Sequence, residues 1–222
     1  MSRYAFFEGR IVPLEEAKVS IMTHAFNYGT GCFEGIRAYW NEADEQLYVF
    51  RMREHYERLH RSCCILRIHL PYTEAELGQI TLDLLRKEIY RQVVYLRPLA
   101  YKASPVIGVR LPDLEDGFAI FAVPFGRYLE QEEGAHVCFS SWRRIDDNAA
   151  PARAKITGTY INSAFAKTDA ILSGYDEALV LTQSGHVSEG SAENLFMVRN
   201  GVLITPPVTS NILEGITRDS II

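Results

Sequence analysis

The sequence lacks several features by which common classes of protein are recognised. Its 222 residues include four cysteines, with no C-x-x-C pair and no metal-ligand spacing, so we expect no metal site. The adjacent Cys63 and Cys64 are poorly placed to form a disulfide, which favours a reducing compartment. No apolar run approaches membrane-spanning length, and the first residues contain no signal-peptide core. We therefore expect a cytoplasmic protein without a membrane partner.

Concentrations of basic charge are also absent. The net charge is -5, from 28 acidic and 23 basic residues, and the two signs are interspersed, which argues against a nucleic-acid partner. The six histidines are scattered and form no H-E-x-x-H motif. There is also no G-x-S-x-G elbow, no P-loop and no G-x-G-x-x-G after a predicted strand. Metal, hydrolase, NTPase and dinucleotide chemistry are therefore not indicated.

Apolar residues make up 47% of the sequence, enough for the core of one large or two modest domains. Their spacing predicts both strands and helices, including a hairpin over residues 195–205 that is marked by Asn200-Gly201. Thr73 and Glu76 form a capping-box signature before a helix. The other predicted strands cover residues 4–7, 10–12, 32–40, 47–51, 93–101, 118–123 and 136–140, with one more from 177, and the other predicted helices cover 53–66 and 160–172.

A punctuated stretch separates two predicted domains. Residues 102–117 include Pro105, Gly108 and Pro112, a composition typical of a connection. We place the boundary near residue 110, which predicts one domain of residues 1–109 and a second of residues 110–222. The last residues, 215–222, read as the opening of a helix that stops after one turn. We therefore expect the second domain to lack its C-terminal part.

Two segments together point to a cofactor. Lys155 lies among small or uncharged residues and is followed by Tyr160, and Glu189 is followed by Gly190 and small residues that let backbone approach a ligand. A lone lysine or glutamate is usually a solvated surface charge. Pyridoxal phosphate, however, needs an amine for its aldehyde and a carboxylate beside its ring nitrogen. The pair of segments therefore favours a pyridoxal phosphate site.

Two predicted strands place polar side chains on shared faces, because residues two apart on a strand point to the same side. Phe33, Gly35 and Arg37 share one such face, and Tyr95 and Arg97 share another. Arginine and tyrosine in these positions suit the binding of carboxylates, since a guanidinium offers two parallel donors. Ordinary surface arginines on solvent-facing strands fit the same pattern.

Two further segments are candidates for binding phosphate. Arg58 follows Glu54 by four residues on a predicted helix, so its default role is an exposed ion pair and its functional role is a phosphate ligand. Gly215-Ile216-Thr217 opens a predicted helix, whose free N–H groups favour an anion. A simple helix cap fits that segment as well.

Taken together, these residues resemble the branched-chain amino acid aminotransferases, which are fold-type IV pyridoxal phosphate enzymes. The resemblance covers essentially the whole chain and rests on six segments in the right order. They are residues 28–37 (YGTGCFEGIR), 53–59 (REHYERL), 95–98 (YLRP), 154–160 (AKITGTY), 188–196 (SEGSAENLF) and 215–219 (GITRD). The resemblance implies an α+β fold with a small N-terminal α/β domain and a larger, β-barrel-like C-terminal domain that is truncated here.

The resemblance also implies roles for individual residues around pyridoxal phosphate. Lys155 would be the Schiff-base lysine and proton shuttle, Glu189 would pair with the pyridine nitrogen, and Tyr160 would bond the ring oxygen. The phosphate would be held by Arg58, Ile216 and Thr217, with Leu213 packed on the ring. The substrate pocket would comprise Phe33, Gly35, Arg37, Tyr95, Arg97 and Tyr128, with Tyr28 and Val109 reaching across the interface of a homodimer.

The activity implied is transfer of the amino group of leucine, isoleucine or valine to 2-oxoglutarate in a ping-pong cycle. A D-amino acid aminotransferase, an amine transaminase or an aminodeoxychorismate lyase of the same fold would keep Lys155 and Glu189. Tyr95 and Arg97, together with residues 33–37, favour the branched-chain type among these. A catalytically silent, dimeric binding protein is a further alternative, against which the joint presence of Lys155, Tyr160 and Glu189 argues.

Overall fold

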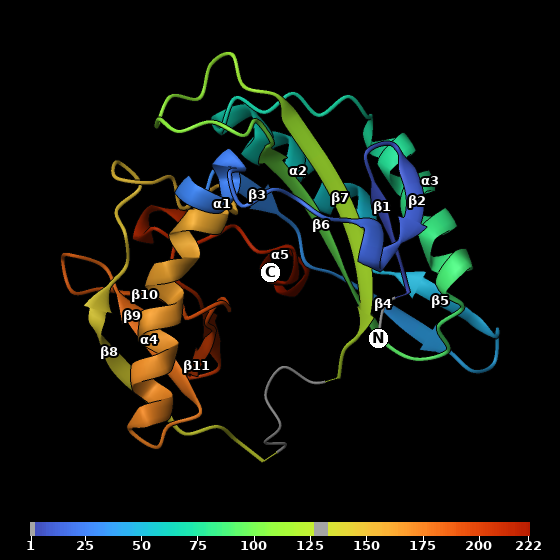
Figure 1. Cartoon of the computed structure of the whole chain (residues 1–222). Helices are drawn as coiled ribbons and strands as arrows, with labels where there is room; N and C mark the ends of the chain where they lie inside the picture. The colour runs from blue at the N-terminus through green and yellow to red at the C-terminus, as the bar shows by residue number, and fades with distance from the viewer. Residues whose placement is uncertain (1–2, 127–132) are drawn as a thin grey trace. The chain divides into compact units, whose positions relative to one another are not determined.

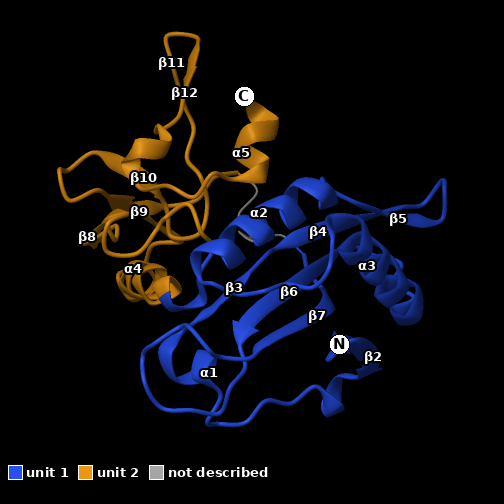
Figure 2. Cartoon of the chain, turned by 90° about the horizontal axis from the view of Figure 1, so that it is seen from above, with its two compact units in different colours: residues 1–126, 155–158 blue, residues 127–154, 159–222 orange. Residues whose placement is uncertain are grey.

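The structure is a computed structural model that describes residues 3–126 and 133–222 (Figure 1). Its internal contacts divide the chain into two compact units, which are coloured separately in Figure 2. Unit 1 comprises residues 1–126 and 155–158, and unit 2 comprises residues 127–154 and 159–222. Within the described ranges, no helix is long and apolar enough to cross a membrane.

Unit 1 is built on a seven-stranded antiparallel sheet with the strand order β2-β1-β7-β6-β4-β5, to which β3 adds by pairing with β6. The strands are β1 (Tyr4–Phe7), β2 (Arg10–Pro13), β3 (Gly31–Phe33), β4 (Ile36–Asn41), β5 (Gln46–Val49), β6 (Val94–Lys102) and β7 (Asp116–Pro124). β6 pairs with β7 along its whole length, from Val94 opposite Pro124 to Lys102 opposite Asp116. β6 therefore organises the sheet, with β3 and β4 on its other side.

The boundary between the units differs from the predicted one after residue 109. β7 pairs with β1 as well as with β6, so it lies inside the sheet of the N-terminal unit. The division therefore falls after Gly126, and the segment Lys155–Gly158 returns to unit 1 from further along the chain. As a result, the N-terminal unit is the larger of the two in this chain. The Pro- and Gly-containing stretch that suggested a boundary is a connection within unit 1.

Unit 1 also contains the short η1 (Leu14–Glu16) and the helices α1 (His24–Tyr28), α2 (Met52–Ile65) and α3 (Glu74–Glu88). The predicted capping box of α3 is confirmed, because Glu76 N donates to Thr73 Oγ1 at 3.3 Å and Thr73 N donates to Glu76 Oε2 at 2.7 Å. The sequence does not predict α1, since five residues are too few to show a helical period.

The core of unit 1 lies between the sheet and two of its helices, α2 and α3, which contact each other and the strands. Its fully buried side chains include Val94 and Leu96 of β6, Tyr56 and Leu59 of α2, and Leu77 and Leu84 of α3. Tyr95 and Arg97 alternate with the buried residues of β6 and are half-buried on the opposite face of the sheet. That second face carries several of the residues predicted to bind substrate.

Unit 2 contains a three-stranded sheet of order β10-β9-β8, formed by β8 (Val137–Arg143), β9 (Glu177–Leu181) and β10 (Val187–Gly190). β8 is parallel to β9 and β10 is antiparallel to it. α4 (Tyr160–Leu172) contacts β8 and β9, and its alanines form a small core with β9. The members of this core are Ala166, Ala170, Ala178 and Val180. The bounds of α4 agree with the prediction.

The rest of unit 2 comprises η2 (Thr157–Thr159, shared with unit 1), the hairpin of β11 (Met197–Arg199) and β12 (Val202–Ile204), η3 (Val208–Ser210) and α5 (Ile216–Ile221). The predicted turn of the hairpin is confirmed, since Asn200 and Gly201 both have positive φ, 52° and 76°. Of the barrel that the resemblance implies, the described residues of unit 2 contain this hairpin and the three-stranded sheet.

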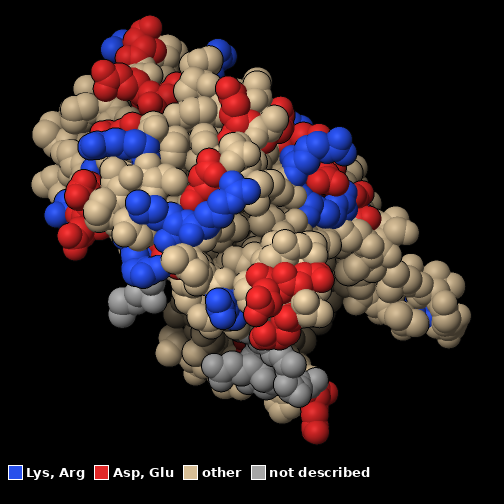
Figure 3. Space-filling view, turned by 90° about the vertical axis from the view of Figure 1, so that its right-hand side faces the viewer, with Lys and Arg blue, Asp and Glu red and all other residues tan. Residues whose placement is uncertain are grey.

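Acidic and basic side chains lie next to one another on the face shown in Figure 3. Short-range pairs of opposite charge form along α2 and α3, such as Arg53 with Glu57 at 3.5 Å and Arg86 with Asp83 at 2.8 Å. Exposed pairs of this kind contribute little to stability. This mixture of signs matches the interspersed charges of the sequence.

Candidate functional site

The Lys155 segment is attached to the edge of β3 in unit 1. Phe33 N donates to the carbonyl of Lys155 at 3.0 Å, and Cys32 forms an isolated antiparallel bridge with Ile156. On the other side, Lys155 N donates to Ser62 Oγ of α2 at 3.2 Å. The backbone of the lysine is thus held by both β3 and α2.

Two glycines, Gly29 and Gly158, allow the Lys155 segment to approach the backbone at the end of α1. Gly158 N donates to the carbonyl of Gly29 at 3.1 Å, and Thr157 Oγ1 donates to the same carbonyl at 2.8 Å. Gly29 has a φ of 66°, and a Cβ on it would lie 2.5 Å from Gly158 Cα. No Cβ fits at that distance from backbone, so Gly29 requires glycine, whereas a Cβ on Gly158 would make a tight contact of 3.1 Å with the carbonyl oxygen of Gly29. These contacts fix where the strand-like Lys155 segment ends.

The Lys155 side chain lies in unit 1 beside the aromatic ring of Phe33, with Nζ 5.1 Å from the ring centroid. Burial lowers the pKa of the Lys155 amine below the ordinary lysine value. The Glu34 carboxylate acts on that pKa in the opposite direction, while Arg58 and Arg97 lower it further. A larger share of this amine is therefore uncharged near neutral pH than of a surface lysine.

Arg58 is buried and pairs with Glu34, which corrects the expectation of an exposed pair with Glu54. Its Nε and Nη2 donate to the two carboxylate oxygens of Glu34, both at 2.7 Å, and His55 Nδ1 donates to Oε2 at 2.7 Å. Glu54 instead pairs with Arg51 at 3.1 Å. The sequence pattern misled because the helix spacing of four residues is local, whereas Glu34 comes from the link between β3 and β4.

The Glu34 carboxyl remains charged despite its burial. Burial by itself raises its pKa, but the hydrogen bonds from Arg58 and His55 outweigh burial and hold the pKa at about 2 instead of the ordinary 4.5. A carboxyl with a pKa lowered by folding stabilises the fold above its ordinary pKa. That contribution is lost as the pH falls from 4.5 toward 2.

The predicted substrate residues on β3, β4 and β6 lie on one face of the sheet. Alternation predicted which residues share a face within each strand, and the pairing of the strands brings the two sets together. The guanidinium carbon of Arg97 lies 4.2 Å from the ring centroid of Phe33, and Arg97 Nη2 donates to the Tyr95 hydroxyl at 2.9 Å. Arg37 pairs in register with Tyr95, and its guanidinium carbon lies 5.2 Å from the ring centroid of Phe125. Both arginines are half-buried, so they are not ordinary surface arginines.

Gly35→Ala is expected to destabilise unit 1 by about 1–3 kcal/mol, the cost typical of overpacking. A Cβ at Gly35 would fall against the phenol of Tyr95, with its Cζ at 2.9 Å and Cε2 at 3.0 Å. Urea denaturation of the variant measures the loss. Adding Tyr95→Phe removes the hydroxyl that the Cβ meets first and should recover part of it. Gly126→Ala is the matched control, because a Cβ there meets nothing within 4 Å; equal effects at both glycines would contradict the prediction.

Tyr28 and Val109, the two residues expected at a dimer interface, lie close together in unit 1. The Tyr28 hydroxyl accepts a hydrogen bond from Gly108 N at 3.0 Å, which places it next to Val109 in the chain. Val109 itself is 79% exposed. Tyr128 lies outside the described residues.

In unit 2, Glu189 is a buried carboxylate at the end of β10. Arg144 Nη2 lies 2.6 Å from Glu189 Oε1, while the amide nitrogen of Asn194 and the backbone nitrogen of Leu213 donate to Oε2 at 3.2 and 3.1 Å. Asn194 also donates to the carbonyl of Leu213 at 2.9 Å. Sequence reasoning missed Arg144 and Asn194, because their partner comes from a different strand or loop. One indication for Asn194 was present in the sequence, because it lies five residues after Glu189 in the same segment, residues 188–196.

The other predicted cofactor residues of unit 2 lie at the ends of helices. Tyr160 is the first residue of α4 and is half-buried. Ile216 and Thr217 open α5, where Ile216 is buried and Thr217 is exposed. A side chain on Gly215, the residue before α5, would collide with Asn194, so the backbone there runs close to the Glu189 cluster. Leu213 belongs to the same cluster through its backbone.

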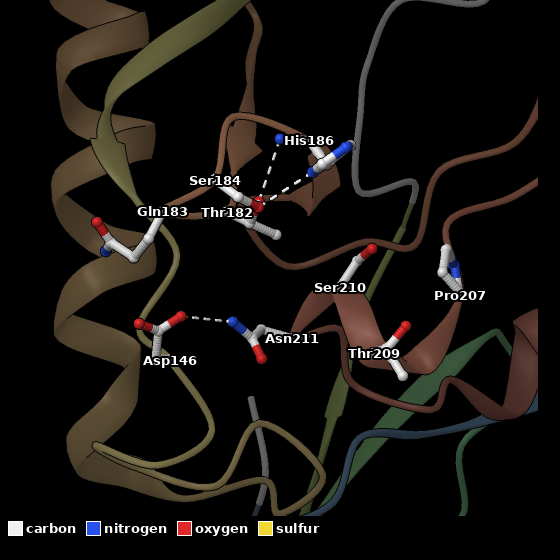
Figure 4. Close-up of a pocket in the computed structure, with 9 residues that line it drawn as sticks. All are labelled: Asp146, Thr182, Gln183, Ser184, His186, Pro207, Thr209, Ser210 and Asn211. Carbon is white, nitrogen blue, oxygen red and sulfur yellow. Dashed lines mark hydrogen bonds between the residues drawn. The ribbon is translucent and has the colours of Figure 1, made fainter.

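Unit 2 also has an open pocket with a volume of about 540 Å³ (Figure 4). The amide nitrogen of Asn211 donates to Asp146 at 2.8 Å on one side of it. On another side Ser184 bonds to both Thr182 and His186, at 3.0 Å each. The lining residues are Asp146, Thr182, Gln183, Ser184, His186, Pro207, Thr209, Ser210 and Asn211. None of the predicted site residues is among them, and the described part of the chain contains no cluster of three metal-binding side chains.

Comparison with known proteins identifies the family. Residues 31–222 match the family model described as Amino-transferase class IV. A curated relative, the probable branched-chain-amino-acid aminotransferase of Aquifex aeolicus strain VF5, is 52% identical over 219 residues, which are 99% of this chain and 70% of the relative.

Two solved structures are similar over nearly the whole chain. The branched-chain aminotransferase from Thermoproteus uzoniensis with norvaline has a TM-score of 0.95 and 47% identity, over 100% of this chain and 73% of that chain. The T.th. branched-chain amino acid aminotransferase complexed with N-(5'-phosphopyridoxyl)-L-glutamate has a TM-score of 0.92 and 41% identity, over 99% of this chain and 72% of that chain. With the family match and these relatives, the chain belongs to the class IV aminotransferase family.

Proposed function

We propose that the chain is a pyridoxal phosphate-dependent aminotransferase that moves the amino group of branched-chain L-amino acids to 2-oxoglutarate. The observation that carries the proposal is the docking of the Lys155 segment on β3 and α2, which sets the lysine amine 5.1 Å from the ring centroid of Phe33. Burial also lowers the pKa of this amine. Relatives named for this activity support it. The norvaline complex supports an aliphatic amino acid, and the phosphopyridoxyl-glutamate complex supports both the cofactor and the second substrate.

The residues of unit 1 fit the reactive end of this cofactor. An uncharged amine is the form that attacks an aldehyde, and the burial of Lys155 favours that form. Two hydrogen bonds to Glu34 hold the Arg58 guanidinium. A guanidinium held at a fixed orientation suits a phosphate group. We assign Lys155 to the aldehyde and Arg58 to the phosphate.

The residues of unit 2 fit the pyridine ring. Glu189 is a buried carboxylate that Arg144, Asn194 and the backbone of Leu213 hold in one orientation. A carboxylate in such a place holds a positive charge on the ring nitrogen. We assign Tyr160 to the ring oxygen, Leu213 to packing on the ring, and Ile216 and Thr217 to the phosphate, as the family resemblance implies.

Bound pyridoxal phosphate supplies an aldehyde for amine exchange and a ring that accepts the electron pair released at the substrate's α-carbon. Lys155 Nζ takes the proton from that carbon and later returns a proton, which makes it the general base and acid of the reaction. The Glu189 carboxylate would stabilise a positive charge on the ring nitrogen. Phe33 lies under the lysine amine and limits the water around it.

The shared face of β3, β4 and β6 is the proposed substrate site. Phe33 and Tyr128 would contact an aliphatic side chain, and Arg37 or Arg97 would bind the second carboxylate of 2-oxoglutarate through two parallel donors. The absence of a side chain at Gly35 makes room for the phenol of Tyr95. Tyr28 and Val109 would reach a second subunit, so we propose a homodimer, and we place it in the cytoplasm.

Assays with L-leucine, D-alanine and a simple amine, each with 2-oxoglutarate, test the proposal by the glutamate formed. We expect glutamate from L-leucine and from isoleucine and valine. Reaction with D-alanine alone would transfer the assignment to a D-amino acid aminotransferase of the same fold. A protein that stays colourless with added pyridoxal phosphate and forms no glutamate would support the silent binding protein instead.

A further inference from the structure

Glu34 is a buried charge that no proposed step of the reaction uses. It is fully buried, and its carboxylate joins two elements of unit 1: its own link between β3 and β4, and α2, through the Arg58 guanidinium and the His55 ring. A buried carboxylate costs free energy unless it is paired, so such an arrangement needs a reason. The neighbouring residue, Phe33, holds the backbone of Lys155 and lies beside its amine.

We propose that Glu34 is a positioning residue that orients Arg58 from one side and supplies negative charge to the surroundings of the Lys155 amine. The proposal rests on the proposed function, because that function assigns Arg58 to a phosphate and Lys155 to an aldehyde. Glu34 touches neither group of the cofactor itself and acts through these two residues.

The orienting part follows from the hydrogen bonds. Arg58 meets Glu34 through Nε and Nη2, which is the side-on, two-bond arrangement that fixes the plane of a guanidinium. His55 Nδ1 binds the oxygen that also receives Nη2, so the carboxylate itself cannot rotate freely. Arg58 is 4% exposed and so reaches a ligand from a fixed direction.

The electrostatic part follows from the charges around Lys155. Glu34 directly follows Phe33, whose backbone N donates to the Lys155 carbonyl at 3.0 Å and whose ring centroid lies 5.1 Å from Lys155 Nζ. The groups that act on this amine include Glu34, Arg58 of α2, and Tyr95 and Arg97 of β6. The two arginines and burial favour the uncharged amine, whereas Glu34 and Tyr95 favour the charged one. Because Glu34 raises the pKa of the Lys155 amine, the amine can hold the substrate's proton after removing it and before returning it. A shuttle that could never hold the proton would fail in half of the cycle.

Labelling of lysines in the cofactor-free chain tests this role without any substrate. Acetic anhydride acylates only uncharged amines, so peptide mass spectrometry over a range from about pH 6 to about pH 10 gives a half-labelling pH for each lysine. Lys18, which is exposed, serves as the internal standard. In Glu34→Gln we expect the half-labelling pH of Lys155 to fall by about one unit, the size typical of a nearby charge. In Arg58→Gln we expect it to rise.

The opposite signs separate this role from a structural one, because damage to the fold would move both variants in the same direction. Glu34→Asp keeps the charge and should return the half-labelling pH toward that of the unchanged protein. The matched control is Glu88→Gln, which removes another buried carboxylate of unit 1, one that binds Arg3 and Tyr4 N. It should leave Lys155 unchanged.

An unchanged half-labelling pH of Lys155 in folded Glu34→Gln would overturn the proposal, as would shifts of the same sign in the Glu34 and Arg58 variants. If Glu34→Gln does not fold, Arg58→Gln decides, provided that its urea denaturation matches that of the unchanged protein: a rise in this folded variant supports the proposal and the absence of a rise overturns it. The labelling is independent of amino transfer. A failure of the substrate assays with intact labelling shifts would reject the proposed function and keep the electrostatic role of Glu34.

Discussion

Lys155→Ala is expected to abolish amino transfer while leaving unit 1 folded. The substitution removes the amine assigned to the aldehyde and to proton transfer, and loss of a positioned general base alone costs about 10²–10⁴-fold in rate. We therefore expect turnover below about a thousandth of that of the unchanged protein. The backbone hydrogen bonds to Phe33 and Ser62 remain, since they do not involve the side chain.

Glutamate formation from L-leucine and 2-oxoglutarate measures the loss, and thermal unfolding measures the fold. The control is Lys18→Ala, which removes an exposed lysine of unit 1 and should leave both unchanged. Borohydride reduction in the presence of pyridoxal phosphate should label the peptide that contains Lys155 in the unchanged protein and leave it unlabelled in the variant. Substantial activity in Lys155→Ala, or a label on a different lysine, would refute the assigned role.

Glu189→Gln is expected to lower turnover by about 10²–10³-fold, the effect of removing one preorganised electrostatic partner. Glutamine keeps the shape and one acceptor oxygen but loses the charge that would face a protonated ring nitrogen. It also leaves Arg144, 15% exposed, without its carboxylate at 2.6 Å. We expect a loss of stability of about 1–3 kcal/mol in addition. Steady-state kinetics and urea denaturation measure the two effects separately.

Unit 2 offers a matched control for this prediction. Glu177 lies on the neighbouring strand β9, is as buried as Glu189, and pairs with Lys167 at 2.6 Å. Glu177→Gln therefore breaks a comparable ion pair on the same sheet and should cost similar stability. It should leave turnover of the folded protein nearly unchanged, because Glu177 has no assigned role. Equal kinetic losses in both variants would show that the effect of Glu189 is structural only.

The local parts of the fold were predictable from the sequence. The Asn200-Gly201 turn, the capping box of Thr73 and the bounds of α4 all depend on residues a few positions apart, and the structure confirms each of them. The shared face of Tyr95 and Arg97 on β6 was predictable for a similar reason, since alternation along a strand decides it.

Pairings between distant segments were not predictable in the same way. Periodicity cannot show that β7 pairs with β1, and so it placed the boundary too early. The partners of the two buried carboxylates were missed for the same reason, because Arg58 reaches Glu34 across 24 residues and Arg144 reaches Glu189 from the strand end of β8. The sequence suggested the nearby Glu54 as the ion-pair partner of Arg58 and suggested no ion-pair partner for Glu189.

The return of residues 155–158 to unit 1 has a consequence for gene fragments and chimaeras. A fragment that stops at Gly126 would carry the sheet, Phe33 and Arg58, yet it would leave behind the lysine that docks on β3. If residues 1–126 were exchanged between relatives, the Lys155 segment of one protein would have to dock on β3 and α2 of the other, next to that protein's Cys32 and Ser62. Recombination that preserves the enzyme must therefore transfer both pieces of sequence together, although more than a hundred residues separate Phe33 from Lys155.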